Sequence, residues 1–216
     1  MGRVQTRTVD QRRVGRPRRP VLDRRRIGEA ALALVDETGS FTLPELARRL
    51  GVQTPSLYHH VDGRAGIVEL LREQVGLSMD AGQLDRRPWD AALRGFFRSY
   101  RAGFAAHPRV VPLLTSSAIR SPDVLAAYEK MLVLLGEVGV PRGEAMAILT
   151  ACENFVIGSA LDLAAPDVMW ELPDDVDAPH LAAALAEQSG PDHRADNAFE
   201  FGLSTLLASI AARSSS

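Results

Sequence analysis

The sequence predicts an all-α protein with a small N-terminal helical bundle and a larger C-terminal one. Apolar residues recur at helical spacing along most of the chain, no segment has a convincing strand pattern, and Pro or Gly stands at most expected helix ends. The two parts differ in charge. Residues 1–64 carry 13 Arg against 7 Asp and Glu, whereas residues 65–216 carry 12 Lys and Arg against 20 Asp and Glu.

This charge asymmetry favours contact between the N-terminal part and a polyanion, and two solvated surfaces of unequal composition are the alternative. Cys152 is the only cysteine among 216 residues, which excludes a disulfide or a Cys-based zinc site within one chain. The chain has no run of about 18 apolar residues and no apolar segment after its basic N-terminus. We therefore expect no membrane span and a cytoplasmic protein.

The first helices are predicted from the residues at their ends. Asp23 is expected to cap a helix that ends at Gly39. In "SFTLPELARRLGV", Thr42 and Glu45 have the spacing of a capping box, and Gly51 ends the second helix after two to three turns. A third short helix over 53–60 and a fourth helix follow. A short capped helix, a glycine turn and a second short helix are typical of a helix-turn-helix, whose second helix enters the DNA major groove.

Helices are predicted at about 88–107, 109–115, 121–138, 141–165, 178–188 and 194–213. The segment 141–165 is apolar on nearly all sides, so we expect it to be central. Glu153 and Asn154 interrupt it, and buried polar groups need partners. A network within the core, a second subunit and a ligand are the three alternatives for these partners.

The turn Leu50-Gly51-Val52, the segment Leu57-Tyr58-His59-His60 and Arg64 at the start of the fourth helix resemble the TetR family of transcriptional repressors. This resemblance covers about residues 22–80. The segments "PWDAALRGFFRSYRAGF", "AILTACENFVIGSAL" and "AFEFGLSTLLASI" are similar to the ligand-binding and dimerising helices of the tetracycline repressor subgroup. We expect a flexible basic arm over 1–21, a DNA-binding domain over 22–68 and a ligand-binding and dimerisation domain over 69–216.

The candidate DNA contacts offer hydroxyl, imidazole, guanidinium or apolar groups to bases and phosphates. They are Thr42, Thr54, Pro55, Ser56, Tyr58, His59, His60 and Arg64. The alternative to DNA contact for Tyr58 is packing between helices. The alternative for Arg48 and Arg49 is that they are ordinary solvated charges on the first helix of the motif. Leu43 and Pro44 stand where the tetracycline repressor offers polar and basic side chains, which implies a different operator.

The N-terminal arm contains "GRPRRP", which resembles an AT-hook core. Arg16, Arg18 and Arg19 are therefore candidate DNA contacts in a minor groove. The alternative is a disordered tail that adds only non-specific charge.

The resemblance implies a ligand cavity between the C-terminal helices, with an apolar and aromatic lining and a few polar anchors. The candidate lining residues are Phe96, Phe97, Tyr100, Phe104, Leu114, Tyr128, Met131, Thr150, Asn154 and Trp170. Phe96, Leu114 and Met131 stand where the tetracycline repressor holds amide and imidazole groups for metal-bound tetracycline. We therefore expect a small, largely apolar or aromatic effector and no magnesium–tetracycline complex, with Met169 and Trp170 as a lid.

The resemblance also implies a homodimer that pairs the central and last helices with those of a second copy. The candidate interface residues are Phe155, Phe199, Gly202, Leu203, Leu206, Leu207 and Ile210. A dimer would place two recognition helices at half-sites of a palindromic operator about 34 Å apart. An effector that changes this separation would release the DNA.

Two other functions are considered. One is a DNA-binding regulator of this fold without a small-molecule effector, controlled by a protein partner or acting architecturally. The other is an enzyme, but the sequence has no nucleophile–base constellation, Gly-rich phosphate loop or metal cluster. His59 and His60 point about 100° apart on a helix and are poorly placed to share an ion. We expect no cofactor and no metal.

Overall fold

The computed structural model describes residues 22–166, 168–187 and 193–213, and within these ranges the chain forms helices and no strand. The predictions on residues 1–21, including Arg16, Arg18 and Arg19, lie outside the described residues. The elements in chain order are α1 (Arg24–Thr38), α2 (Leu43–Leu50), α3 (Thr54–Tyr58), α4 (Gly63–Gly76), the 3-10 helix η1 (Ala81–Asp85), α5 (Trp89–Ala106), the 3-10 helix η2 (Pro108–Val110), α6 (Val111–Thr115), α7 (Pro122–Glu137), α8 (Arg142–Leu163), α9 (Pro179–Glu187) and α10 (Arg194–Arg213). The all-α prediction is confirmed.

The ends of the first two helices have local causes that the sequence already contains. The side chain of Asp23 accepts a hydrogen bond from the Arg26 amide at 2.8 Å, and Gly39 ends α1 at a φ of 78°. The Thr42 hydroxyl accepts from the Glu45 amide at 3.3 Å, while the Glu45 carboxylate accepts from the Thr42 amide at 3.0 Å. These bonds satisfy backbone donors that a helix start otherwise leaves unpaired.

The N-terminal helices pack around one apolar cluster. α1 packs along α4, and Leu57 anchors the short α3 because its side chain is fully buried. The same cluster includes Phe104 from α5, Val110 from η2 and Leu114 from α6. It also includes residues of α4 on both sides of the predicted domain boundary at 68/69, so the packing has no break there.

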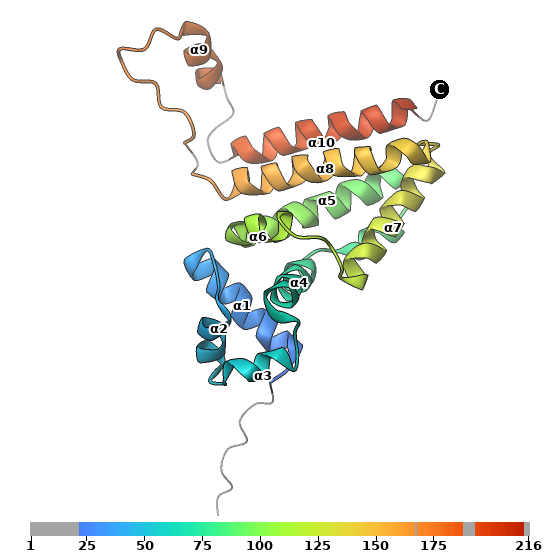
Figure 1. Cartoon of the computed structure of the whole chain (residues 1–216). Coiled ribbons are helices and arrows are strands. Elements are labelled where there is room, and N and C mark those ends of the chain that lie inside the picture. The colour runs from blue at the N-terminus through green and yellow to red at the C-terminus, as the bar shows by residue number, and fades with distance from the viewer. Residues whose placement is uncertain (1–21, 167, 188–192, 214–216) are drawn as a thin grey trace, which may run out of the picture.

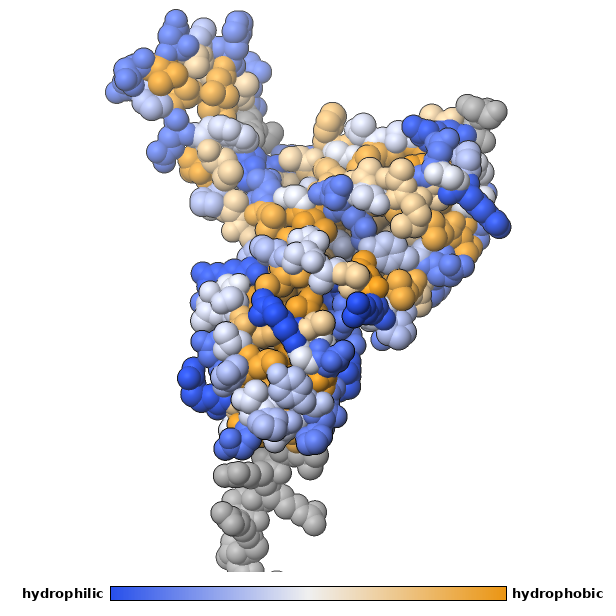
Figure 2. Space-filling model, viewed as in Figure 1, coloured by the Kyte–Doolittle hydropathy of each residue, from blue (hydrophilic) through white to orange (hydrophobic). Residues whose placement is uncertain are grey.

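The C-terminal part is a layered bundle in which α8 packs between α5 and α10, with α7 across one end (Figure 1). Its core includes Leu93, Phe97, Leu149, Val156 and Phe199. In Figure 1, α9 projects away from this bundle, and none of its residues is buried. Figure 2 shows apolar residues gathered on this projecting arm, with hydrophilic residues around them.

α8 is long and apolar enough to cross a membrane by length and composition, with a mean hydropathy of 1.4 in its most apolar window. A central helix of a soluble bundle passes the same test. Here α8 packs against α5, α7 and α10, which matches the central position that its sequence predicted.

Candidate DNA interface and ligand cavity

The short helix α3 has one buried and one exposed side. Leu57 faces the core, whereas Pro55, Tyr58 and His59 are exposed. The Tyr58 side chain is 59% exposed, so its ring does not fill a space between helices. Thr54, Ser56 and His60 are partly exposed around it. The helix therefore presents hydroxyl, phenol and imidazole groups to solvent on one side.

Three polar residues beside α3 have partners within the chain. The Arg64 guanidinium lies 4.4 Å from the centre of the Phe41 ring and donates to the Phe41 carbonyl oxygen at 2.8 Å. Thr42 uses its hydroxyl in the capping box. Arg49 forms a two-bond ion pair with Glu37, at 2.6 Å each, which lowers the pKa of that carboxyl.

These contacts refine the predicted DNA contacts. Arg64 remains exposed at the start of α4, while its guanidinium is oriented by Phe41. The Thr42 hydroxyl is occupied by Glu45 in the free protein, so its role as a DNA contact is the least supported of the set. Arg48 and Arg49 are both exposed, and the ion pair gives Arg49 a partner within the fold.

A cavity of about 440 Å³ lies between α4 and the C-terminal helices α5, α7 and α8. Six predicted lining residues border it: Phe96, Tyr100, Phe104, Leu114, Tyr128 and Met131. Arg24 and Arg25 at the start of α1 and Arg72 on α4 border it as well. The cavity is therefore shared between the helices that carry the helix-turn-helix and those of the C-terminal bundle.

Four other predicted lining residues lie elsewhere, and the prediction is corrected for them. Phe97 is buried in the C-terminal core, one helix position away from the cavity-lining Phe96. Thr150 and Asn154 are exposed on α8 and do not border the cavity. Trp170 is 50% exposed on the segment 168–187, the arm that carries α9. The Arg194 guanidinium lies 5.5 Å from the centre of its ring.

Glu153 also borders the cavity, although it is not in the predicted lining set; a ligand was one of the three alternatives for its partner. Both Tyr100 and Tyr128 donate their phenol hydroxyls to the same carboxylate oxygen, Oε1 of Glu153, with a distance of 3.3 Å for Tyr100. Burial raises the pKa of Glu153 and of both phenols, because a charge is poorly solvated there. Of the three alternatives for Glu153, ligand contact and a core network therefore remain compatible.

The neighbouring Cys152 faces the core and does not border this cavity. It is buried in the C-terminal core, and burial raises the pKa of its thiol to about 11. A thiol that stays protonated at neutral pH is a poor nucleophile. This agrees with a packing role for Cys152.

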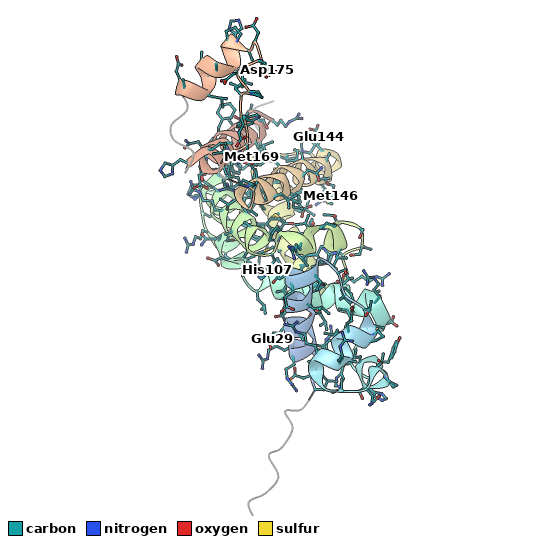
Figure 3. The ribbon with its side chains drawn as sticks, turned by 90° about the vertical axis from the view of Figure 1, so that its left-hand side faces the viewer. Glu29, His107, Glu144, Met146, Met169 and Asp175 are labelled. Carbon is teal, nitrogen blue, oxygen red and sulfur yellow. The ribbon has the colours of Figure 1, made fainter. Side chains whose placement is uncertain are left out.

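Polar contacts connect the helix-turn-helix to the C-terminal helices on two sides. On the cavity side, Arg72 donates to the carbonyl oxygens of Leu114 at 3.0 Å and Ser117 at 3.2 Å. At the far end of α1, a ring nitrogen of His107 lies 2.8 Å from a carboxylate oxygen of Asp36. Figure 3 shows His107 at this junction between α1 and the C-terminal helices. A shift of α4 or α6 must therefore change contacts of the DNA-binding part.

The predicted dimer interface is corrected in part. Four of them have their side chains in the chain's own core: Phe199, Leu203, Leu207 and Ile210. Phe155 and Gly202 form a close helix contact, since a Cβ at Gly202 would overlap the Phe155 ring. Phe155 and Leu206 are only partly buried.

The apolar side chains that α8 and α10 leave exposed are different ones. They are Met146 at 51%, Leu161 at 42%, Leu163 at 40% and Phe201 at 78%. Figure 3 labels Met146 at the end of α8 that also carries Glu144. We call this exposed face of the two helices, together with Thr150 and Asn154, the outer face.

The comparisons with known proteins agree with these features. Residues 81–214 match the family model described as the tetracyclin repressor-like, C-terminal domain. The tetracycline repressor protein class A from transposon 1721 of Escherichia coli is 30% identical over 195 residues, which cover 85% of this chain and 88% of the relative. The transcriptional repressor DrrR1 of Streptomyces coeruleorubidus is 29% identical over 152 residues, 69% of this chain. That match spans only 56% of DrrR1.

ActR of Streptomyces coelicolor, solved without ligand, is similar in fold, with a TM-score of 0.73 and 23% identity over 90% of this chain and 97% of ActR. ActR has also been solved in complex with actinorhodin. The fold and the two regions described above define a helix-turn-helix regulator with a ligand-binding domain. The chain belongs to the TetR family of transcriptional repressors, whose members bind DNA operators and small-molecule effectors and act as dimers. Because this family consists of regulators, the enzyme alternative is discarded.

Proposed function

We propose that this protein is a homodimeric repressor that binds a palindromic operator and is released by a small, largely apolar or aromatic effector. The observation that carries the proposal is the position of the cavity, which is bordered by α4 on one side and by α5, α7 and α8 on the other. A molecule in this cavity would touch both parts of the chain. A regulator controlled only by a protein partner has no need of such a cavity, so that alternative is less well supported. Binding to chromosomal DNA goes with a cytoplasmic location.

DNA recognition is assigned to the exposed side of α3. Tyr58 and His59 are the most accessible groups for phosphates and base edges, with Pro55 offering apolar contact to a thymine methyl group. Arg64, oriented by Phe41, would bind a phosphate at the start of α4. The basic arm over 1–21 would add contacts in a minor groove or non-specific attraction.

Dimerisation is assigned to the outer face of α8 and α10. Phe201 and Met146 are large apolar side chains that one chain leaves in solvent, and a second copy would cover them. The arm with α9, which has no buried residue of its own, would pack on the second copy. Asp175, a labelled residue of this arm, lies beyond the bundle in Figure 3.

Release is assigned to the contacts of α4. An effector that separates α4 from α6 would strain the bonds from Arg72 to Leu114 and Ser117. Because α4 packs along α1 and follows α3 directly, its movement would change the position of the recognition helix. A change in the distance between two recognition helices weakens binding to a fixed pair of half-sites.

The test is a titration of the full chain against the DNA that flanks its own gene, followed by footprinting. We expect protection of a palindrome, loss of affinity of about tenfold or more for Tyr58→Ala, and no loss for the matched control Tyr128→Phe, which lies in the cavity. Binding without a palindromic footprint, or equal affinity of the Tyr58→Ala variant, would contradict the assignment.

A further inference from the structure

The inference rests on the proposed function, and it concerns the chemistry of the effector. Glu153 is one of several ionisable residues that border the cavity, and most of the other lining residues are apolar or aromatic. Its Oε1 accepts both phenol hydrogen bonds. Within the part of the chain that the structure describes, its Oε2 has no hydrogen-bond partner and no Arg, Lys or His forms an ion pair with it.

The three arginines at the cavity are already engaged. Arg24 pairs with Glu73 at 3.1 Å, and Arg25 pairs with Glu29 at 2.5 Å. Arg72 has Glu69 at 3.4 Å, and its Nη2 donates to two carbonyl oxygens. The guanidiniums are therefore committed to other partners. The positive charge of Arg72 acts on Glu153 and lowers its pKa, but no described Arg, Lys or His forms an ion pair with that carboxyl.

A second polar group in the cavity wall also lacks a partner. Ser121, which precedes α7, is only 3% exposed, and its hydroxyl has no hydrogen-bond partner among the described residues. Buried hydroxyls are normally hydrogen-bonded, and one left without a partner costs free energy. A bound molecule with its own donor or acceptor would satisfy it.

We infer that the effector is an aromatic or polycyclic molecule that carries a protonated amine, which binds the Glu153 carboxylate, and a second polar group for Ser121. The amine supplies the cation that the fold withholds from Glu153, and charge-assisted hydrogen bonds of this kind are the stronger ones. Phe96 and Tyr100, whose ring centroids are 5.8 Å apart, border the cavity and would contact the apolar body of the molecule. Burial raises the pKa of Glu153, and neither the two phenols nor the charge of Arg72 offsets this effect.

An anionic effector fits less well. It would meet the Glu153 carboxylate, and Glu73 and Asp123 are further acidic residues at the cavity. The only basic groups at hand are the three engaged arginines, which would have to give up their present partners.

The experiment uses three probes with one ring system: anthracenylmethylamine, anthracenylmethanol and anthracene carboxylate. Each is titrated into the full chain without DNA, because cationic aromatic amines bind DNA themselves, and binding is followed by calorimetry. We expect the amine to bind at least tenfold more tightly than the alcohol, and the carboxylate to bind most weakly. Equal binding of amine and alcohol, tighter binding of the carboxylate, or binding of none of the three overturns the inference.

Two variants test whether Glu153 causes the preference for the amine over the alcohol. Glu153→Gln keeps a hydrogen-bonding group beside the phenols but removes the charge, so it should bind amine and alcohol equally. The matched control Glu129→Gln, an exposed carboxyl on the same bundle that does not border the cavity, should keep the preference. An amine preference that survives in Glu153→Gln overturns the inference. If that variant fails to fold, the comparison of the three probes on the native chain still decides.

The same probes separate this inference from the proposed function. Preference for the amine without release of operator DNA supports the charge assignment and contradicts the effector role of the cavity. Release by the alcohol as readily as by the amine supports the effector role and contradicts the charge assignment.

Discussion

The helix-turn-helix and the C-terminal cavity hold their functional polar groups in opposite environments. On α3, Tyr58 and His59 are exposed because Leu57 alone connects that helix to the core. In the cavity, Glu153 is largely enclosed and two phenols donate to it. A solvated group adds binding without weakening the fold, whereas a buried carboxyl costs folding free energy until a partner arrives. DNA recognition and fold stability therefore depend on different residues in the helix-turn-helix. In the cavity, ligand recognition and fold stability depend on the same carboxyl.

The largest expected effect tests whether fold stability and DNA contact depend on different residues of α3. Leu57→Ala removes a fully buried side chain and should lower the free energy of unfolding by about 2–5 kcal/mol. Tyr58→Ala, one residue further on, should change it by less than about 0.5 kcal/mol because the ring is exposed. Urea denaturation of both variants measures the difference. Similar losses of stability would show that Tyr58 also supports the fold.

The next effect concerns the outer face. Phe201→Glu puts a charge where we propose a second copy packs, and it should raise the dimer dissociation constant by roughly 30-fold, or about 2 kcal/mol. Leu125→Glu is the matched control, since Leu125 is an exposed apolar residue of α7, outside the outer face. Sedimentation equilibrium measures both. A dimer that tolerates Phe201→Glu would mean that the outer face does not form the interface.

The smallest effect tests whether the buried Glu153 carboxyl in the cavity lowers the stability of the fold. Folding raises the pKa of Glu153 above its ordinary value of 4.5, so the folded chain holds this proton more tightly than the unfolded chain. Stability from this group is therefore full below pH 4.5 and is lost as the pH rises through the raised pKa. Glu153→Gln removes that loss, so its stability relative to the native chain should be higher at pH 7 than at pH 4. Urea denaturation at both pH values measures it.

A control completes this test. Glu129→Gln should leave the pH dependence unchanged, because Glu129 is exposed. If Glu153→Gln and Glu129→Gln behave alike, the burial of Glu153 has no energetic consequence and the coupling is absent.

Much of the fold could be predicted because its signals are local. The cap of Asp23, the capping box of Thr42 and the turn at Gly51 act within a few residues, and all three are present in the structure. The predicted C-terminal helices lie within two residues of the observed ones. η1 was missed, since a single turn of 3-10 helix has no apolar periodicity to reveal it.

The sequence by itself therefore determined the helices, the helix-turn-helix and the family, since these depend on neighbouring residues and on motif spacing. Only the tertiary structure decided which side of α8 faces inward, because that helix is apolar on nearly all sides and has no polar face to orient it. Adjacent residues of a helix diverge by about 100°. For this reason Glu153 borders the cavity while Asn154 lies on the outer face, and Phe199 fills the core while Phe201 is exposed.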